Sequence, residues 1–378
     1  MPPACRGAAV AAIKRAAKVA GLAAGAVAAG SVQAVDLPED RAETMYHLYD
    51  GGGVIAQGPA LLVRKSMLDR VSLSGSWYVD AVSNASIDVV TTASKFKEVR
   101  NQGGVGLDYV VRDSLIHVSG SRSVEPDYQA STLGVDLTQD VFGGMTTVLL
   151  GYSHADDKVG QHGTPGWVGT AHHWQYRLGI TQILTPRWQA SANLESIDDD
   201  GYLQSPYRLA RVFGSYIHEN APTTRESKAL KLSATGDITP EGATNRRSLR
   251  ADYRYYWDTW GIRGHTLELA YNRNLAPGWL LESFVRYYRQ NHALFYSDNA
   301  PTQTLYVSRN RELATMHDFG PGVTVSYTLR SIPGKYDVKL NSSYQFIDFH
   351  YADYTRPDTG KPYSYHASVF NTVLSATF

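Results

Sequence analysis

The stretch VSLSGSWYVDAV (Val71–Val82) alternates in character at every residue. Apolar or small side chains, including Trp77, occupy the odd positions, and Ser, Tyr and Asp80 occupy most of the even ones. Successive side chains of a β-strand point to opposite faces, so a period of two predicts a strand with one apolar and one polar face. The same period can be followed outward along the chain.

Four further segments repeat this alternation clearly: RWQASANLES (187–196), SLRADYRYYWD (248–258), GVTVSYTLR (322–330) and YDVKLNSSYQF (336–346). Such segments run to roughly ten residues, the length that a tilted strand needs to cross a bilayer. A soluble β-sandwich also places apolar residues on one face, but its strands are shorter and more evenly spaced. Short turns mostly alternate with long polar connections, which is typical of an outer-membrane barrel.

We predict an all-β fold for residues 35–378, an antiparallel transmembrane β-barrel of 16 strands with short periplasmic turns and long extracellular loops. The sheet has to close, because an open edge in hydrocarbon leaves backbone groups without partners. Fourteen strands is the alternative, since Asp50–Gly53 is compatible with a bulge inside one long strand. The predicted strands are 42–49, 57–66, 71–82, 102–112, 114–124, 130–139, 144–154, 172–183, 187–196, 226–236, 246–258, 264–274, 278–290, 318–330, 336–347 and 365–378, and the long loops are 83–101, 154–173, 197–225, 291–316 and 348–366.

The first 34 residues differ in character from the rest. An apolar Ala/Gly/Val run follows four basic residues, Arg6, Lys14, Arg15 and Lys18, and ends on small residues. We therefore predict a secretory signal peptide at residues 1–34, since the run is too short to span a bilayer comfortably as a helix. Removal of this segment takes away the only Cys. It also lowers the number of basic residues from 36 to 32 and leaves the 36 acidic residues unchanged. A mature chain of net charge −4 gives no support for nucleic-acid binding, and a chain without Cys has no disulfide.

The inner face of such a barrel should line water, because about 16 strands enclose more space than side chains can fill. Both signs of charge occur at the expected inward positions, which predicts a mixed, cross-paired lumen. The residues expected to line it are Asp80, Asp108, Arg177, Glu195, Lys231, Arg250, Asp252, Arg254, Glu268, Arg286, Arg330 and Lys339. Aromatic residues at strand ends are expected to form the two interfacial girdles, namely Trp77, Trp174, Trp188, Trp257, Trp260, Trp279, Tyr287, Tyr327 and Tyr336.

The expected loop 154–173 is rich in possible metal ligands: His154, Asp156, Asp157, His162, His172 and His173. Such ligands could hold Zn²⁺ or Cu²⁺. We assign no metal site there, because residues scattered over a solvated loop share no regular element that would fix their geometry. The run Asp198–Asp200 lacks the alternate spacing of a calcium loop. No cofactor is predicted, and no local signature singles out a catalytic Ser, His or Asp, so we expect a protein that is not an enzyme.

Two further stretches carry predictions of their own. SNASIDVVTTAS (Ser83–Ser94) is too apolar for a solvated loop, so it is expected either to fold back into the barrel mouth or to form a rim hairpin. The chain ends in NTVLSATF, with Phe370, Leu374 and Phe378 at alternate positions counted back from the end. This ending resembles the C-terminal signal read by the barrel-assembly machinery, and it predicts that the last strand pairs with the first.

Three stretches together resemble a family of proteobacterial outer-membrane barrel proteins known only as a domain of unknown function. They are MYHLYDGGGV (45–54) with GPALLVRKSM (58–67), WYVDAVSNASIDVVTTASKFKEVR (77–100) and DLTQDVFGGMTTVLLGYS (136–153). Members of the family tend to be encoded beside a small lipoprotein, a thioredoxin-like protein and periplasmic proteins carrying covalent flavin. The resemblance therefore implies a role in moving electrons or a redox-linked solute across the outer membrane, and it carries over no catalytic residue.

We expect the protein in the outer membrane of a Gram-negative bacterium, in contact with lipid, lipopolysaccharide and the barrel-assembly machinery. The leading hypothesis is a porin-like channel or conduit for a small polar solute. One alternative is a scaffold that sheathes or anchors a small lipoprotein or a periplasmic redox protein without conducting. An outer-membrane hydrolase is the least favoured alternative.

Overall fold

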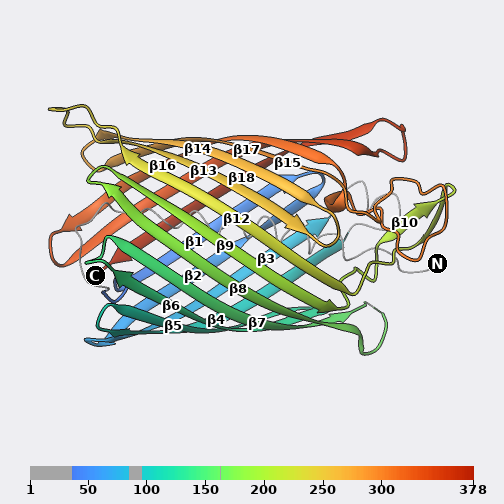
Figure 1. The fold of residues 1–378 in the computed structure, drawn as a ribbon, viewed down its shortest axis with the longest axis horizontal. Coiled ribbons are helices and arrows are strands. Elements are labelled where there is room, and N and C mark those ends of the chain that lie inside the picture. The colour runs from blue at the N-terminus through green and yellow to red at the C-terminus, as the bar shows by residue number, and fades with distance from the viewer. Residues whose placement is uncertain (1–35, 85–95, 162) are drawn as a thin grey trace.

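The computed structural model describes residues 36–84, 96–161 and 163–378, which form a closed barrel of 16 antiparallel strands (Figure 1). The predicted all-β barrel and its strand count are therefore confirmed. The predicted signal peptide (1–34), most of the Ser83–Ser94 stretch and His162 lie outside the described residues.

The barrel is built mainly from hairpins of neighbouring strands. Its strands are β1 (Arg41–Gly51), β2 (Val54–Leu68), β3 (Val71–Asn84), β4 (Phe96–Val111), β5 (Ser114–Glu125), β6 (Tyr128–Val141), β7 (Thr146–Gly160), β8 (Trp167–Thr185), β9 (Trp188–Gly201), β12 (Thr224–Asp237), β13 (Arg247–Asp258), β14 (Arg263–Ala276), β15 (Trp279–Gln290), β16 (Met316–Ile332), β17 (Tyr336–Thr355) and β18 (Pro362–Thr377). Two short strands, β10 (Leu209–Val212) and β11 (Ser215–His218), form a separate sheet in the connection between β9 and β12.

The ring closes where β1 pairs with β18, from Arg41 opposite Thr377 to Gly51 opposite Ala367. A two-residue turn then joins β1 to β2, with φ of +58° at Gly52 and +80° at Gly53. Positive φ at both central positions is the geometry of a type I′ hairpin turn, which Gly adopts without steric cost. The segment is thus a turn and not a bulge, and the 14-strand alternative is wrong.

The two ends of the barrel differ. One end carries the start of β1, the end of β18 and tight connections such as 186–187 and 277–278, and we call it the short-turn end. At the opposite, long-loop end, two of the predicted loops are largely strand: β7 and β8 extend to Gly160 and from Trp167, and β17 and β18 extend to Thr355 and from Pro362. Backbone pairing continues beyond the apolar part of each strand, because polar side chains on neighbouring strands also form favourable cross-strand pairs.

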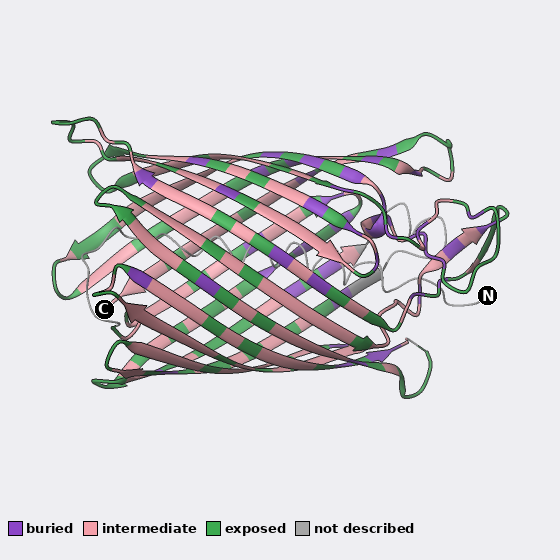
Figure 2. Ribbon diagram, viewed as in Figure 1, coloured by how far each residue is buried: buried purple, intermediate pink, exposed green. Residues whose placement is uncertain are grey.

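The two faces of the wall differ as the period of two predicts. Exposed large apolar side chains occupy alternate positions on strand after strand, among them Leu61, Leu73, Val105, Leu133, Leu178, Leu232, Leu267 and Leu374. Figure 2 shows the matching alternation of exposed and less exposed residues along the strands. The convex outer face is the apolar one, and polar residues fill the concave inner face. An apolar band of this extent fits contact with lipid rather than with water.

Helical structure is scarce in the described part of the chain, where one 3-10 turn, η1 (Arg311–Leu313), follows β15. Across residues 36–84, 96–161 and 163–378, no helix has the length and apolar character needed to cross a membrane.

Residues 202–223 and 291–315 fold against each other at the long-loop end, and we call this pair of segments the mouth cap. Asn220 and Val307 exchange two backbone hydrogen bonds of 3.0 and 2.9 Å, and Ala210 packs with Ala300 in a buried apolar cluster. Both segments were expected to be polar loops. The structure corrects this, because their few apolar residues meet each other across the two segments.

Candidate functional site

Ion pairs follow the inner face of the wall. The largest group centres on Arg250 of β13, whose guanidinium lies 2.9 Å from Asp252 and 3.0 Å from Glu268. Glu282 lies 3.9 Å from the same guanidinium, and Lys231 of β12 lies 3.6 Å from Asp252. Asp252 and Glu268 are direct cross-strand partners, so both project from the same face of the sheet.

Similar pairs occur on the neighbouring strands, and we call the whole set the paired-charge belt. Its other members are Arg64–Asp108 (3.6 Å), His117–Asp108 (2.6 Å), Arg177–Asp136 (2.8 Å), Arg254–Glu195 (3.8 Å) and Arg286–Asp318 (2.7 Å). These residues come from strands between β2 and β16, so charges of both signs surround most of the lumen.

A glycine makes one of these pairs possible. Asp136 on β6 and Arg177 on β8 are the cross-strand partners of Gly151 on the intervening β7. A Cβ atom at Gly151 would overlap the Asp136 carboxylate and crowd the Arg177 guanidinium. The missing side chain therefore lets the two charges meet over the backbone of β7.

Closer to the long-loop end, Asp80 on β3 is nearly fully buried and lies between an imidazole and a guanidinium. One oxygen lies 2.5 Å from His47 on β1, and the other accepts a hydrogen bond of 2.5 Å from Arg100 on β4. The Tyr78 ring stacks on His47 with centroids 4.7 Å apart. A buried carboxylate needs such partners to stay ionised, so the cluster joins β1, β3 and β4 on the inner wall.

A second group of this kind lies on β6 to β9. His173 of β8 lies 2.6 Å from Asp199 through Nδ1 and 3.0 Å from Asp157 through Nε2. Tyr128 donates a short hydrogen bond to Asp157. Both ring nitrogens of His173 thus face carboxylates, which favours the doubly protonated imidazolium.

The mouth cap links nearly opposite sides of the barrel mouth. At one side, Tyr207 of the cap donates a short hydrogen bond to Asp127 in the turn between β5 and β6. At the other side, Tyr296 donates to the carbonyl oxygen of Asp353 on β17, 2.9 Å away. Around the ring of 16 strands, β6 and β17 are seven positions apart in one direction and nine in the other, so the cap spans much of the mouth.

The centre of the cap is polar and buried. Ser308 donates to Glu219 across the two cap segments at 2.6 Å. Arg309 lies 2.8 Å from Asp298, donates to the Tyr354 hydroxyl at 3.1 Å and lies over the Tyr354 ring. Burial raises the pKa of the Tyr296 hydroxyl above its usual range, so this group stays protonated and acts as a donor.

Comparison with known protein families gives a match that covers residues 23–346. The matching family is DUF3570, a family of proteins of unknown function. The chain belongs to the DUF3570 family. A comparison with curated proteins found no match.

Solved structures that resemble this DUF3570 barrel are outer-membrane proteins of low sequence identity. A bacterial polysaccharide outer membrane secretin is 9% identical, with a TM-score of 0.49, over 90% of this chain and 100% of the other. OmpT of Vibrio cholerae is 10% identical, with a TM-score of 0.43, over 89% and 96%. A Pseudomonas aeruginosa FadL homologue is 9% identical, with a TM-score of 0.43, over 90% of each chain. No function is carried over at such distances.

Eleven of the 12 residues expected in the lumen occupy inner-face positions, and ten of these take part in the contacts described above. Lys339 is the other, at the short-turn end, where it lies 3.8 Å from Asp337 and is half exposed. Phe370, Leu374 and Phe378 of the predicted assembly signal are exposed, with Phe370 and Leu374 at outer-face positions of β18.

Arg330 departs from the prediction. A bulge shifts the register of β16 against β17 between Thr328 and Arg330, so Arg330 pairs with Val338. Its guanidinium lies over the ring of Tyr336, 5.8 Å from the centroid, among the outer-face residues. The bulge adds one residue and reverses the side to which Arg330 points.

Two other expectations were also wrong. Trp260 is not in a girdle: it is 7% exposed, donates to the carbonyl oxygen of Thr224 at 2.9 Å and meets Phe295 edge-on. The His/Asp cluster of residues 154–173 is not a scattered loop either. It divides between the two faces of β7 and β8, with Asp157 and His173 inside and the remaining described members outside.

Sequence reasoning missed several inner-face residues: His47, His117, Asp136, Asp157, His173, Asp199 and Asp318. The period of two could have identified some of them. His173, Gln175 and Arg177 are alternate residues of one strand, so they share the inner face on which Arg177 was predicted. The predicted strand 172–183 already contained these three residues, but His173 was counted with the loop 154–173.

Proposed function

We propose that the chain is a non-enzymatic pore of the outer membrane that passes small polar solutes. The apolar outer band and the closed ring support a place in a membrane, because only a sheet without edges satisfies its backbone there. Outer-membrane barrels are the setting in which such walls occur.

The paired-charge belt is the observation that carries the proposal. Several of its basic side chains are only partly covered, since those of Arg250 and Lys231 are each 33% exposed, whereas the carboxylates of Asp108 and Asp318 are nearly buried against their partners. Charges taken fully out of water would cost several kcal/mol each, so a wall of this kind favours a hydrated lumen. Polar solutes can replace that water without meeting an apolar barrier.

The two signs of charge indicate the class of solute. Acids and bases of the belt lie within 4 Å of each other, so their fields largely cancel in the lumen. We therefore infer weak ion selectivity and passage of neutral or zwitterionic polar molecules. The mouth cap reaches from the β5–β6 turn to β17 across the long-loop end, which favours small solutes over large ones.

Recording from planar bilayers tests the proposal. The refolded protein should give stable, stepwise conductance with little preference between K⁺ and Cl⁻, and heat-unfolded protein from the same preparation should give none. An absence of steps from folded barrels would reject the pore and favour the scaffold. The link to a lipoprotein or a periplasmic redox protein stays a prediction, which co-purification can examine separately.

A further inference from the structure

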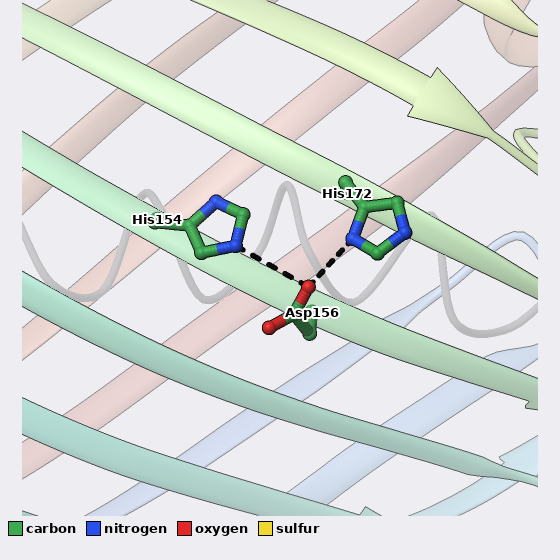
Figure 3. Close-up of side chains that lie close together, drawn as sticks. All are labelled: His154, Asp156 and His172. Atoms are coloured by element: carbon green, nitrogen blue, oxygen red, sulfur yellow. Dashed lines mark hydrogen bonds and ion pairs between the residues drawn. The ribbon is translucent and has the colours of Figure 1, made fainter.

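Three side chains converge on the outer face of the wall, near the long-loop end. His154 and Asp156 extend from β7 and His172 from β8, and they point toward one another (Figure 3). Asp156 Oδ1 lies 2.6 Å from His172 Nδ1 and 3.3 Å from His154 Nε2. One ligand atom of each residue lies within 4.8 Å of the other two.

The strand register fixes this arrangement. Asp156 and His172 are direct cross-strand partners, and His154 is two residues from Asp156 on the same strand and face. The Trp174 ring packs beside both imidazoles, with centroids 5.2 Å from His154 and 6.1 Å from His172. The objection that no regular element holds these ligands therefore does not apply, because two paired strands do.

The donor set and its spacing suit a transition-metal ion. Imidazole nitrogen and carboxylate oxygen bind Zn²⁺ and Cu²⁺, and tetrahedral Zn²⁺ with bonds of about 2.0–2.2 Å places its ligands about 3.3–3.5 Å apart. The separation of 3.3 Å between Asp156 and His154 matches that value, and the separation of 2.6 Å between Asp156 and His172 would have to widen by less than about 1 Å, so modest side-chain rotations would seat an ion. Asp200 of β9 is the cross-strand partner of His172 and can supply a fourth ligand.

The surroundings leave the cluster accessible from outside the barrel. Exposed Tyr152, Tyr176 and Leu178 lie closer to the short-turn end on the same face, so the cluster stands where the apolar band gives way to polar residues. The side chains of His154, His172 and Asp156 are 33%, 44% and 58% exposed. An ion would reach them without passing through lipid or the lumen.

We propose that His154, Asp156 and His172 form a binding site for a divalent transition-metal ion such as Zn²⁺ or Cu²⁺ on the outer rim of the barrel. Three protein ligands leave one position for Asp200, for water or for an anionic oxygen of the headgroup layer. The site is separate from the lumen and does not depend on the proposed pore.

Fluorescence of Trp174 provides a local test, because bound Cu²⁺ quenches a nearby indole. Subtracting a Trp174→Phe variant isolates this signal in refolded protein. Cu²⁺ should quench it saturably, and excess Zn²⁺ should restore it, whereas Mg²⁺ prefers all-oxygen sites and should not. Loss of an outer-sphere partner lowers metal affinity about 10–100-fold, so His172→Ala should raise the half-quenching concentration at least about tenfold.

His265→Ala is the matched control, since His265 is an outer-face histidine on β14 that contacts Tyr253 instead of an acid. It should leave the Trp174 titration unchanged. Asp156→Asn and His154→Gln repeat the test if His172→Ala fails to fold. Absence of saturable quenching in the wild type, or equal titrations for His172→Ala and His265→Ala, would overturn the proposed site.

Discussion

The backbone N–H of Phe378 donates to the carbonyl oxygen of Asp40 across 3.0 Å. This bond lies at the end of the seam where β18 pairs with β1 and the ring closes. Lys65 of β2 completes the junction, because its ammonium lies over the Phe378 ring and 2.6 Å from an Asp40 carboxylate oxygen. The last residue of the chain and the residue before the first strand thus share one contact.

Deleting Phe378 should impair membrane assembly severalfold while the refolded barrel remains stable. One lost hydrogen bond costs only about 1 kcal/mol, which is too little to open a ring of this size. The defect should therefore appear in cells, as less folded protein in the membrane fraction on gels that separate folded from heat-unfolded barrels. Thr377→Ala is the control, and normal assembly of the truncation would count against a C-terminal signal.

Asp40 should make stability depend on acid pH. Hydrogen bonds from Lys65 and Ser66 lower the pKa of Asp40 from 3.8 to about 2. A lowered folded pKa means that the ionised form stabilises the barrel, fully above about pH 4, and that this contribution is lost as the pH falls through about 2. The contribution should be about 1 kcal/mol or less, as for other pairs near the surface.

Urea unfolding between pH 6 and pH 2, compared for the wild type and Asp40→Asn, measures this effect. The wild type should lose more stability than the variant over the acid part of that range. Asp69→Asn, in the turn between β2 and β3 at the same end of the barrel, should follow the wild type. Parallel curves for the wild type and Asp40→Asn would exclude the Asp40 contribution.

The strand count was predictable because a period of two is a local property of the chain. The strand ends at the long-loop end were not predictable. In β7 and β8, for example, the backbone hydrogen bonds extend several residues beyond the point where apolar side chains stop alternating with polar ones. Arg330 shows a second limit: a bulge reverses a side chain without breaking the pattern around it. A third limit is distance, since Glu219 and Ser308 meet in the mouth cap although they are 89 residues apart.

The charged inner wall was predicted as a set of residues, but the partners were not. Alternation places Arg177 and Glu195 on one face, whereas only the register shows that Arg177 meets Asp136 over Gly151. Register depends on turn geometry and on pairing of the whole ring. The geometry of the outer cluster of His154, Asp156 and His172 was missed for the same reason, since it exists only once β7 and β8 are paired.

Neutralising one acid of the paired-charge belt should change the ion preference of the pore. Asp252→Asn leaves Arg250 and Lys231 less compensated, so Cl⁻ should gain over K⁺ and the reversal potential in a salt gradient should shift by several millivolts. Arg250→Gln should shift it the opposite way. Asp358→Asn, in the exposed turn between β17 and β18, should change nothing, and equal reversal potentials for all variants would place the belt outside the conduction path.

Arg309→Ala should release the mouth cap without weakening the barrel. The Arg309 side chain is 5% exposed and lies against Asp298, whose side chain is 20% exposed. Removing one partner of a buried pair costs about 3–5 kcal/mol, and the partial exposure of Asp298 brings the expected cost to about 2–4 kcal/mol of local stability. The 16-strand ladder does not include this residue, so global unfolding should change little.

Hydrogen exchange resolves the two effects, because it measures the cap and the strands separately. Amides of 291–315 should exchange faster in Arg309→Ala, while those of β13 to β16 keep their protection. Arg356→Ala, which breaks an exposed pair with Asp358 outside the cap, should leave both unchanged. If the cap narrows the pore, Arg309→Ala should also raise the mean conductance. Faster exchange with unchanged conductance would mean that the cap is held by Arg309 but lies beside the permeation path.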